Sequence, residues 1–225
     1  MHIISNFLDS HMKKRHYVTL NWNKHWGTTE EPEEARRFAI KMADKVSDFI
    51  QDKNKIINSI ADYGCGPATL LFILAKRFPY KEFYGFDIAE SIIKRNVKKA
   101  SQLNLQNLHF EQDGLPNPRK KRKFDLITCF ATLHYVKEIK VAIRNLFELI
   151  NPGGYLIFNY PNTFTRAAYR RDIKPNDNHM KRRFALVLAG ENLLSLKKIR
   201  ETLGVRPRKF YSSTKANIYV LVHKA

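Results

Sequence analysis

The sequence predicts an α/β fold: a doubly wound, mostly parallel seven-stranded sheet with an antiparallel C-terminal hairpin and helices on both faces. Strand-like apolar runs alternate with amphipathic stretches along most of the chain, as in parallel sheets. One strand-to-helix turn contains two glycines, and two strand-like runs joined by a short polar turn end the chain. We divide the 225 residues into a leader and helix at residues 1–55, expected to cover the ligand site, and a main domain at residues 56–225.

The expected helices follow from apolar side chains that recur on one face. The first runs from Pro32 to about Gln51, and Thr28 or Thr29 is expected to cap its acidic N-terminus. The last should stop at Gly204, because glycine readily adopts the left-handed conformation that ends a helix. The other helices are expected at about residues 68–77, 90–103, 138–150 and 193–203.

The expected strands are short apolar runs bounded by turn residues. The fourth is largely apolar, as a strand covered on both sides of a sheet should be. The last two are separated by a short polar turn, which indicates the closing hairpin. The strands are expected at residues 56–61, 82–86, 108–111, 123–130, 155–159, 208–211 and 216–222.

The glycine-containing turn after the first strand is the most informative local feature. Gly64 and Gly66 allow backbone amides to approach a ligand at the N-terminus of the following helix. Thr69 stands where a dinucleotide-binding turn has its third glycine. The carboxylate of Asp62, just before the glycines, would repel a pyrophosphate and attract the ammonium group of an amino-acid-like cofactor. S-adenosyl-L-methionine is a cofactor of that kind.

Two further carboxylates follow the next strands. Asp87 lies 23 residues after Gly64, at the end of the second strand, where a carboxylate can accept hydrogen bonds from both ribose hydroxyls. Asp113 follows the third strand and can accept a hydrogen bond from an adenine amino group. These spacings together favour an adenosine-containing cofactor.

With these residues, the chain resembles the class I, Rossmann-like S-adenosylmethionine-dependent methyltransferases, closely over residues 56–160. The family's turn usually ends in a further glycine, which Ala68 replaces here, and Asn151-Pro152-Gly153-Gly154 before the fifth strand is another shared feature. The resemblance implies an enzyme, a transferase that uses S-adenosyl-L-methionine. The cofactor-binding residues that it implies are Asp62, Gly64, Gly66, Asp87, Ile88, Asp113, Gly114 and Phe130. A cofactor-binding scaffold without activity and a nicotinamide-dependent oxidoreductase are the disfavoured alternatives.

The candidate catalytic residue is His134, which follows the fourth strand in a stretch that lies beside the methyl group in the resembled family. Imidazole can accept a proton near neutral pH, although a structural histidine at a strand-to-helix junction is the alternative. This stretch lacks the Asn/Asp-Pro-Pro-aromatic motif of enzymes that methylate adenine or cytosine amines, and Cys129 lacks the setting of a nucleophile. The candidate acceptor-binding residues are Trp26, Tyr160, Arg166, Tyr169 and Arg170.

The net charge of +19 indicates an anionic partner. Residues 161–225 carry 15 basic and four acidic side chains, and a basic insertion at about residues 161–188 is expected to form the acceptor cover. A solvated cationic surface is the alternative. The basic run at residues 119–123 resembles a nuclear-import signal, and an exposed loop is its plainer interpretation.

The expected function is methyl transfer to a small or medium-sized anionic acceptor. The alternative is a tRNA or rRNA methyltransferase that contacts the RNA backbone with its basic C-terminal half. Two cysteines give no disulfide framework, and neither a signal peptide nor an apolar run of about 20 residues stands out, so a cytoplasmic location without a transmembrane segment is expected. The eight histidines and two cysteines show no metal-ligand spacing.

Overall fold

A computed structural model describes residues 21–52, 56–119 and 121–225 of the chain. They form a seven-stranded sheet with the order β3-β2-β1-β4-β5-β7-β6, in which β7 runs antiparallel to both of its neighbours and the pairs among β1 to β5 are parallel. The strands are β1 (Ser59–Tyr63), β2 (Glu82–Asp87), β3 (Leu108–Gln112), β4 (Phe124–Cys129), β5 (Ile150–Asn159), β6 (Arg208–Thr214) and β7 (Asn217–His223). This architecture confirms the predicted fold class.

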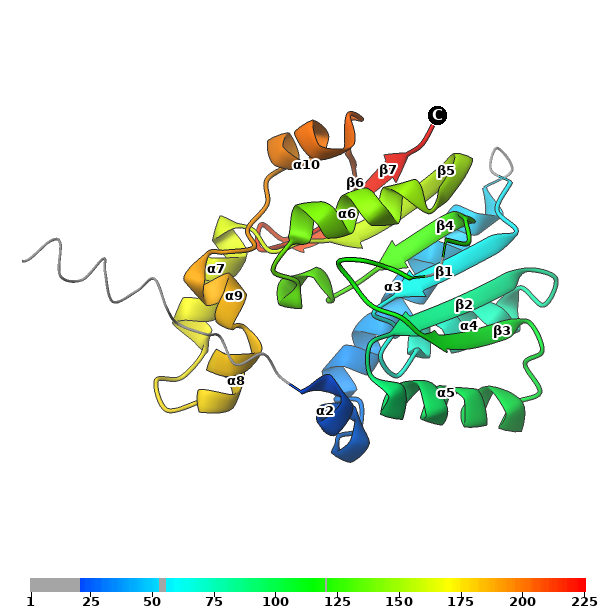
Figure 1. Ribbon diagram of the computed structural model, residues 1–225, viewed down its shortest axis with the longest axis horizontal. Helices are drawn as coiled ribbons and strands as arrows, with labels where there is room; N and C mark the ends of the chain where they lie inside the picture. Colours follow the sequence, from blue (N-terminus) through cyan, green and yellow to red (C-terminus); the bar gives the residue numbers. More distant parts are fainter. Residues whose placement is uncertain (1–20, 53–55, 120) are drawn as a thin grey trace, which may run out of the picture.

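Helices cover both faces of the sheet (Figure 1). α3, α4 and α5 share one apolar cluster with the sheet, and α6 and α10 share the other. The remaining helices, α2 and the group α7 to α9, lie together at one end of the sheet. The α-helices are α2 (Trp22–Thr28), α3 (Glu33–Gln51), α4 (Thr69–Arg77), α5 (Glu90–Gln102), α6 (Ile139–Glu148), α7 (Thr163–Asp172), α8 (Asn178–Arg183), α9 (Ala185–Ala189) and α10 (Leu196–Leu203), and η1 (Leu133–Tyr135) is a 3₁₀ turn.

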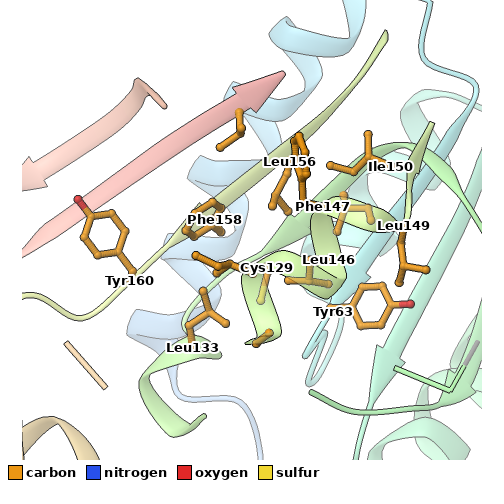
Figure 2. Close-up of a cluster of buried hydrophobic side chains, with 14 of the residues drawn as sticks. Tyr63, Cys129, Leu133, Leu146, Phe147, Leu149, Ile150, Leu156, Phe158 and Tyr160 are labelled. Atoms are coloured by element: carbon orange, nitrogen blue, oxygen red, sulfur yellow. The ribbon is translucent and has the colours of Figure 1, made fainter. Parts of the chain in front are cut away.

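The core holds β4 and β5 between these helices. Figure 2 shows the cluster on the α6 side, where Leu146 and Phe147 of α6 meet Leu156 and Phe158 of β5. All four are at least nine-tenths buried, and burying one such side chain stabilises a fold by about 1.5–3 kcal/mol. The carboxyl ends of the strands next to this core are therefore held rigidly.

The N-terminal part of the described chain differs from the prediction. Residues 22–28 form a helix of their own, α2, whose N-cap Asn21 accepts a hydrogen bond from the Lys24 amide at 3.0 Å. Thr28 donates to the Lys24 carbonyl at 3.1 Å inside α2, so the expectation that Thr28 or Thr29 caps the next helix is wrong. α3 instead follows Pro32, which makes no side-chain cap. Residues 1–20 of the predicted leader lie outside the described residues.

β1 begins at Ser59 and ends at Tyr63, later than the predicted run at residues 56–61. β1 pairs with β2 from Ser59 onward, which brings Asp62 to the turn and leaves Gly64 to begin it with φ of 78°. A Cβ atom on Gly64 would lie 2.2 Å from Oγ1 of Thr132, so no other residue fits there. Ala68, which replaces the family's further glycine, has φ of 57° and precedes α4.

We expect Ala68→Gly to stabilise the domain by up to about 1 kcal/mol. The left-handed conformation costs a non-glycine residue about 1–2 kcal/mol, and the extra freedom of glycine in the unfolded chain offsets part of that gain. Ala75→Gly, inside α4, is the control and should destabilise by about 1 kcal/mol or more. Urea unfolding measures both, and equal destabilisation by the two substitutions would show that Ala68 is not strained.

Candidate active site

A cavity of about 560 Å³ lies at the carboxyl ends of β1 to β4. Ligands bind at this edge in open parallel sheets, because the strand-to-helix turns present backbone amides and side chains there. All eight predicted cofactor-binding residues line it: Asp62, Gly64, Gly66, Asp87, Ile88, Asp113, Gly114 and Phe130. Side chains of α2 and α3, among them Trp22, Trp26 and Glu31, form part of its wall, as do Tyr135 and Arg183.

The Asp87 carboxylate fixes the shape of the glycine turn. It accepts hydrogen bonds from the amide of Gly66 at 3.0 Å and from that of Ala89 at 2.9 Å. Asn96 donates to the Gly66 carbonyl at 2.7 Å from α5. Burial raises the pKa of Asp87, and the backbone hydrogen bonds oppose that shift. The turn is thus held in place before any ligand binds.

Asp62 is a buried carboxylate on the cavity wall. It accepts a hydrogen bond from Oγ1 of Thr128 at 2.8 Å, and no basic side chain of the described residues forms an ion pair with it. Burial raises the pKa of Asp62 to about 7, with a smaller contribution from the charge of Asp87 and an opposing one from Thr128. A buried carboxylate that lacks a cation fits the ammonium group of S-adenosylmethionine.

Asp113 is also buried, but its carboxylate points partly into its own loop. Oδ1 accepts hydrogen bonds from the amides of Gly114 at 2.8 Å and Arg119 at 3.0 Å. That Asp113 binds an adenine amino group therefore stays a prediction. Ile88, which is 57% exposed, lies against Gly114 and offers an apolar surface to a flat ring.

α2 covers the glycine turn. The Trp22 ring packs against that of Tyr135 with centroids 4.6 Å apart, and the Trp26 ring is the nearest group to a Cβ placed on Gly66, at 3.4 Å. Asn23 holds the helix to α5, since its side chain accepts from the Ser91 amide and its carbonyl from the Ser91 hydroxyl, both at 2.8 Å. The described part of the predicted cover therefore contacts both the glycine turn and the turn after β4.

His134 is not among the residues that line the cavity. Its side chain is only 6% exposed, and burial lowers the pKa of the imidazole to about 4. Asn192 donates to the carbonyls of Leu133 and His134 at 3.1 and 2.9 Å and so holds the 3₁₀ turn that directs the neighbouring Tyr135 to the cavity. The role of His134 as a general base stays a prediction that this placement does not favour.

Of the predicted acceptor-binding residues, Trp26 alone lines the cavity. Tyr160 is 2% exposed and packs in the core beside Phe158, as Figure 2 shows. Arg166 and Arg170 both donate to the Leu188 carbonyl, at 3.0 and 3.5 Å, and so tie α7 to α9. Tyr169 packs on Phe184 with ring centroids 4.3 Å apart. The structure therefore brings Arg166, Tyr169 and Arg170 together against α9 and Phe184 and away from the cavity.

The sequence reasoning missed Tyr135 and Arg183 as cavity residues. Nε of Arg183 donates to the Tyr135 hydroxyl at 3.1 Å, which joins the end of α8 to the turn after β4. Arg183 belongs to the predicted basic insertion, but nothing in the sequence separates it from the exposed Arg182 beside it. Tyr135 directly follows His134, so the sequence reasoning selected the right turn but the neighbouring residue.

This strand order, with acidic side chains at the ends of β1 and β2 and after β3, defines the class I S-adenosylmethionine-dependent methyltransferases. The chain belongs to the methyltransferase-domain family, whose model matches residues 50–215. The resemblance inferred from the sequence is therefore confirmed, together with the enzyme class and the cofactor. Within the described residues there is no group of side chains that could hold a metal ion and no helix able to cross a membrane.

Two curated relatives are O-methyltransferases. A malonyl-[acyl-carrier protein] O-methyltransferase of Ilyobacter polytropus is 27% identical over 162 residues, which cover 72% of this chain and 59% of the relative. A ubiquinone biosynthesis O-methyltransferase of Coxiella burnetii is 32% identical over 129 residues, which cover 53% of this chain and 54% of the relative. The chain thus spans little more than half the length of the relatives that it matches.

Solved structures show the same fold at low sequence identity. An S-adenosylmethionine-dependent methyltransferase from Clostridium acetobutylicum has a TM-score of 0.66 and 14% identity, over 83% of this chain and 92% of that one. The magnesium protoporphyrin IX methyltransferase of Synechocystis with bound SAH has a TM-score of 0.60 and 18% identity, over 91% and 93% of the two chains.

We expect the affinity for S-adenosylmethionine to rise with pH up to about pH 7. Below that pH Asp62 is protonated in the free protein, and binding of an ammonium group releases the proton. The affinity should therefore fall about tenfold per pH unit well below pH 7. Calorimetry from pH 5.5 to 8, in buffers of different ionisation enthalpy, measures the affinity and the proton release.

Two substitutions test the assignment to Asp62. Asp62→Asn should bind weakly and without this pH dependence. Thr128→Val removes the hydrogen bond that favours the charged carboxylate, so it should move the midpoint to higher pH. A midpoint that Thr128→Val does not move would assign the titration to another group.

His134 should make the domain sensitive to acid. Its pKa is about 4 in the folded chain against 6.5 in the unfolded chain, so between these values only the unfolded chain takes up the proton. Stability from this source is complete above pH 6.5 and lost as the pH falls toward 4. Between pH 7.5 and 4.5 we expect the unfolding free energy of His134→Gln to fall by about 1–3 kcal/mol less than that of the wild type. An unchanged pH slope would contradict the buried neutral imidazole.

Proposed function

We propose that this chain transfers the methyl group of S-adenosylmethionine to a small or medium-sized anionic acceptor. The observation that supports this most strongly is a single cavity with two chemically different halves. The ends of β1, β2 and β3 supply carboxylates and backbone amides suited to an adenosyl amino acid, whereas the residues after β4, with α2 and α8, supply aromatic rings and one guanidinium. An acceptor on the β4 side would lie next to the methyl group.

The residues of the chain act mainly by positioning. S-adenosylmethionine would supply a methyl group on a positively charged sulfur; an acceptor atom in line with the carbon–sulfur bond would bond to the methyl carbon as that bond breaks and its electrons pass to sulfur. Asp87 would orient the ribose and Asp62 the ammonium group. Trp22 and Trp26 would exclude water from the cavity. Tyr135 and Arg183 would form the wall against which the acceptor lies. A base is needed only where the acceptor atom still carries its proton.

The size of the cavity and the curated relatives favour a small acceptor over RNA. A cavity of about 560 Å³, partly covered by α2, must hold the adenosyl group and the reacting part of the acceptor. The names of the relatives refer to malonyl-acyl carrier protein and to ubiquinone biosynthesis. An RNA acceptor keeps support from the net charge of +19.

Methyl-labelled S-adenosylmethionine and a fractionated cell extract test this proposal. We expect label in a fraction that resists nuclease and changes little with salt concentration. Label that nuclease removes, with a yield that falls steeply as salt rises, would support RNA and overturn the small acceptor.

A matched pair of variants ties the labelling to the cavity. Asp87→Ala should weaken S-adenosylmethionine by at least tenfold and abolish the labelling at low cofactor concentration, because hydrogen bonds to a charged group are worth about 1.5–3 kcal/mol. Asp172→Ala, an exposed carboxylate on α7, is the control and should behave as wild type. Equal labelling by both variants would exclude the cavity as the source of the activity.

A further inference from the structure

Arg183 is held rigidly in the cavity wall by aromatic groups. Its Nε donates to the Tyr135 hydroxyl at 3.1 Å, and the guanidinium lies 5.5 Å from the ring centre of Phe184 and 5.8 Å from that of Tyr135. Among the described residues no carboxylate forms an ion pair with it. Tyr135 accepts from Nε and leaves the two terminal nitrogens of the guanidinium for other acceptors. The spacing of these two nitrogens matches that of the two oxygens of a carboxylate.

Two histidines lie near Arg183, one on each of the helices α2 and α8. The rings of His25 and His179 stack with centroids 6.3 Å apart and planes at 30°. Burial lowers the pKa of His25, and the positive charge of Arg183 and then His179 lowers it further, so Arg183 is close enough to be felt there. Neither histidine forms an ion pair with a carboxylate of the described residues. Three groups that carry or can carry positive charge therefore lie close together, and no carboxylate of the described residues forms an ion pair with any of them.

We propose that Arg183, flanked by His25 and His179, binds a carboxylate group of the methyl acceptor at the junction of α2 and α8. This inference rests on the proposed function and assigns the acceptor-binding cation to α8, not to Arg166 or Arg170 of α7. Neither of those arginines lines the cavity, and each donates one hydrogen bond to the Leu188 carbonyl. A carboxylate at Arg183 would also face the imidazoles of His25 on α2 and His179 on α8, and so would link the two helices beside the cavity.

The two tryptophans of the chain make this site directly observable, because Trp22 and Trp26 both line the cavity. The experiment uses the whole 225-residue chain saturated with S-adenosylhomocysteine at pH 7 and low salt. Benzoate is the carboxylate probe, and benzamide is its neutral isostere. We expect benzoate to change the tryptophan fluorescence saturably, and benzamide to bind at least tenfold more weakly. Equal effects of the two probes would overturn the proposal.

Variants of α8 locate the site. Arg183→Gln should weaken benzoate at least tenfold, and Arg183→Lys, which keeps the charge but not the paired nitrogens, should weaken it less. Arg182→Gln changes the charge equally on the same helix but is exposed and absent from the cavity wall, so it should bind benzoate as wild type does. Equal losses in the 182 and 183 variants would reduce the effect to net charge and overturn the site.

Calorimetry with S-adenosylhomocysteine distinguishes failure of the proposed function from failure of the Arg183 site. A wild-type protein that does not bind it would refute the proposed function itself. Normal binding together with benzoate affinity that ignores Arg183 would refute this inference alone. If Arg183→Gln loses S-adenosylhomocysteine through misfolding, Tyr135→Phe serves instead, because it removes only the hydroxyl that orients the guanidinium and should weaken benzoate several-fold. Saturable binding of phenyl phosphate without benzoate would overturn the carboxylate as the ligand.

Discussion

The pair of hydrogen bonds from Gly66 and Ala89 to the Asp87 carboxylate is the interaction on which the site depends. The Gly66 bond joins the end of β2 to the turn after β1, next to the backbone bonds from Gly64 and Cys65 to the Phe86 carbonyl, and the Ala89 bond holds the start of the turn after β2. The positive φ of Gly64 and the missing Cβ atoms let the turn pass close to Thr132 and Trp26. One carboxylate therefore shapes the cavity and is also the group expected to hold the ribose.

The same architecture buries charge at a cost. Asp62 has a pKa of about 7 in the folded chain, against 3.8 as its ordinary value, so between these limits the folded chain retains a proton that the unfolded chain has lost. The contribution of Asp62 to stability therefore falls as the pH rises through this interval. Above pH 7 the folded domain holds a desolvated negative charge, which a bound ammonium group would compensate. The buried charge of Asp62 lowers the free energy of unfolding of the free domain, and binding of the cofactor's ammonium group would raise it again.

The sequence reasoning succeeded where a residue's place depends on its own strand. Asp62, Asp87 and Asp113 lie on the cavity because each stands at or after a strand end, and parallel strands bring those ends to one edge. It failed where tertiary packing decides. Arg166 and Arg183 belong to the same basic segment, and the contacts between α7 and α9, which no periodicity reveals, turn the first inward and leave the second in the cavity wall.

The two halves of the cavity consequently differ in how firmly the fold holds them. The cofactor half is formed by turns at the ends of buried strands, so a change there disturbs the core. The half proposed for the acceptor is formed by α2, α8 and the turn after β4, and side-chain contacts join them: Asn23 with Ser91, and both the Trp22 ring and Arg183 with Tyr135. Side chains on these two helices can change without repacking the sheet. Substitutions in α2 and α8 would therefore alter the half proposed for the acceptor and leave the turns at the strand ends in place.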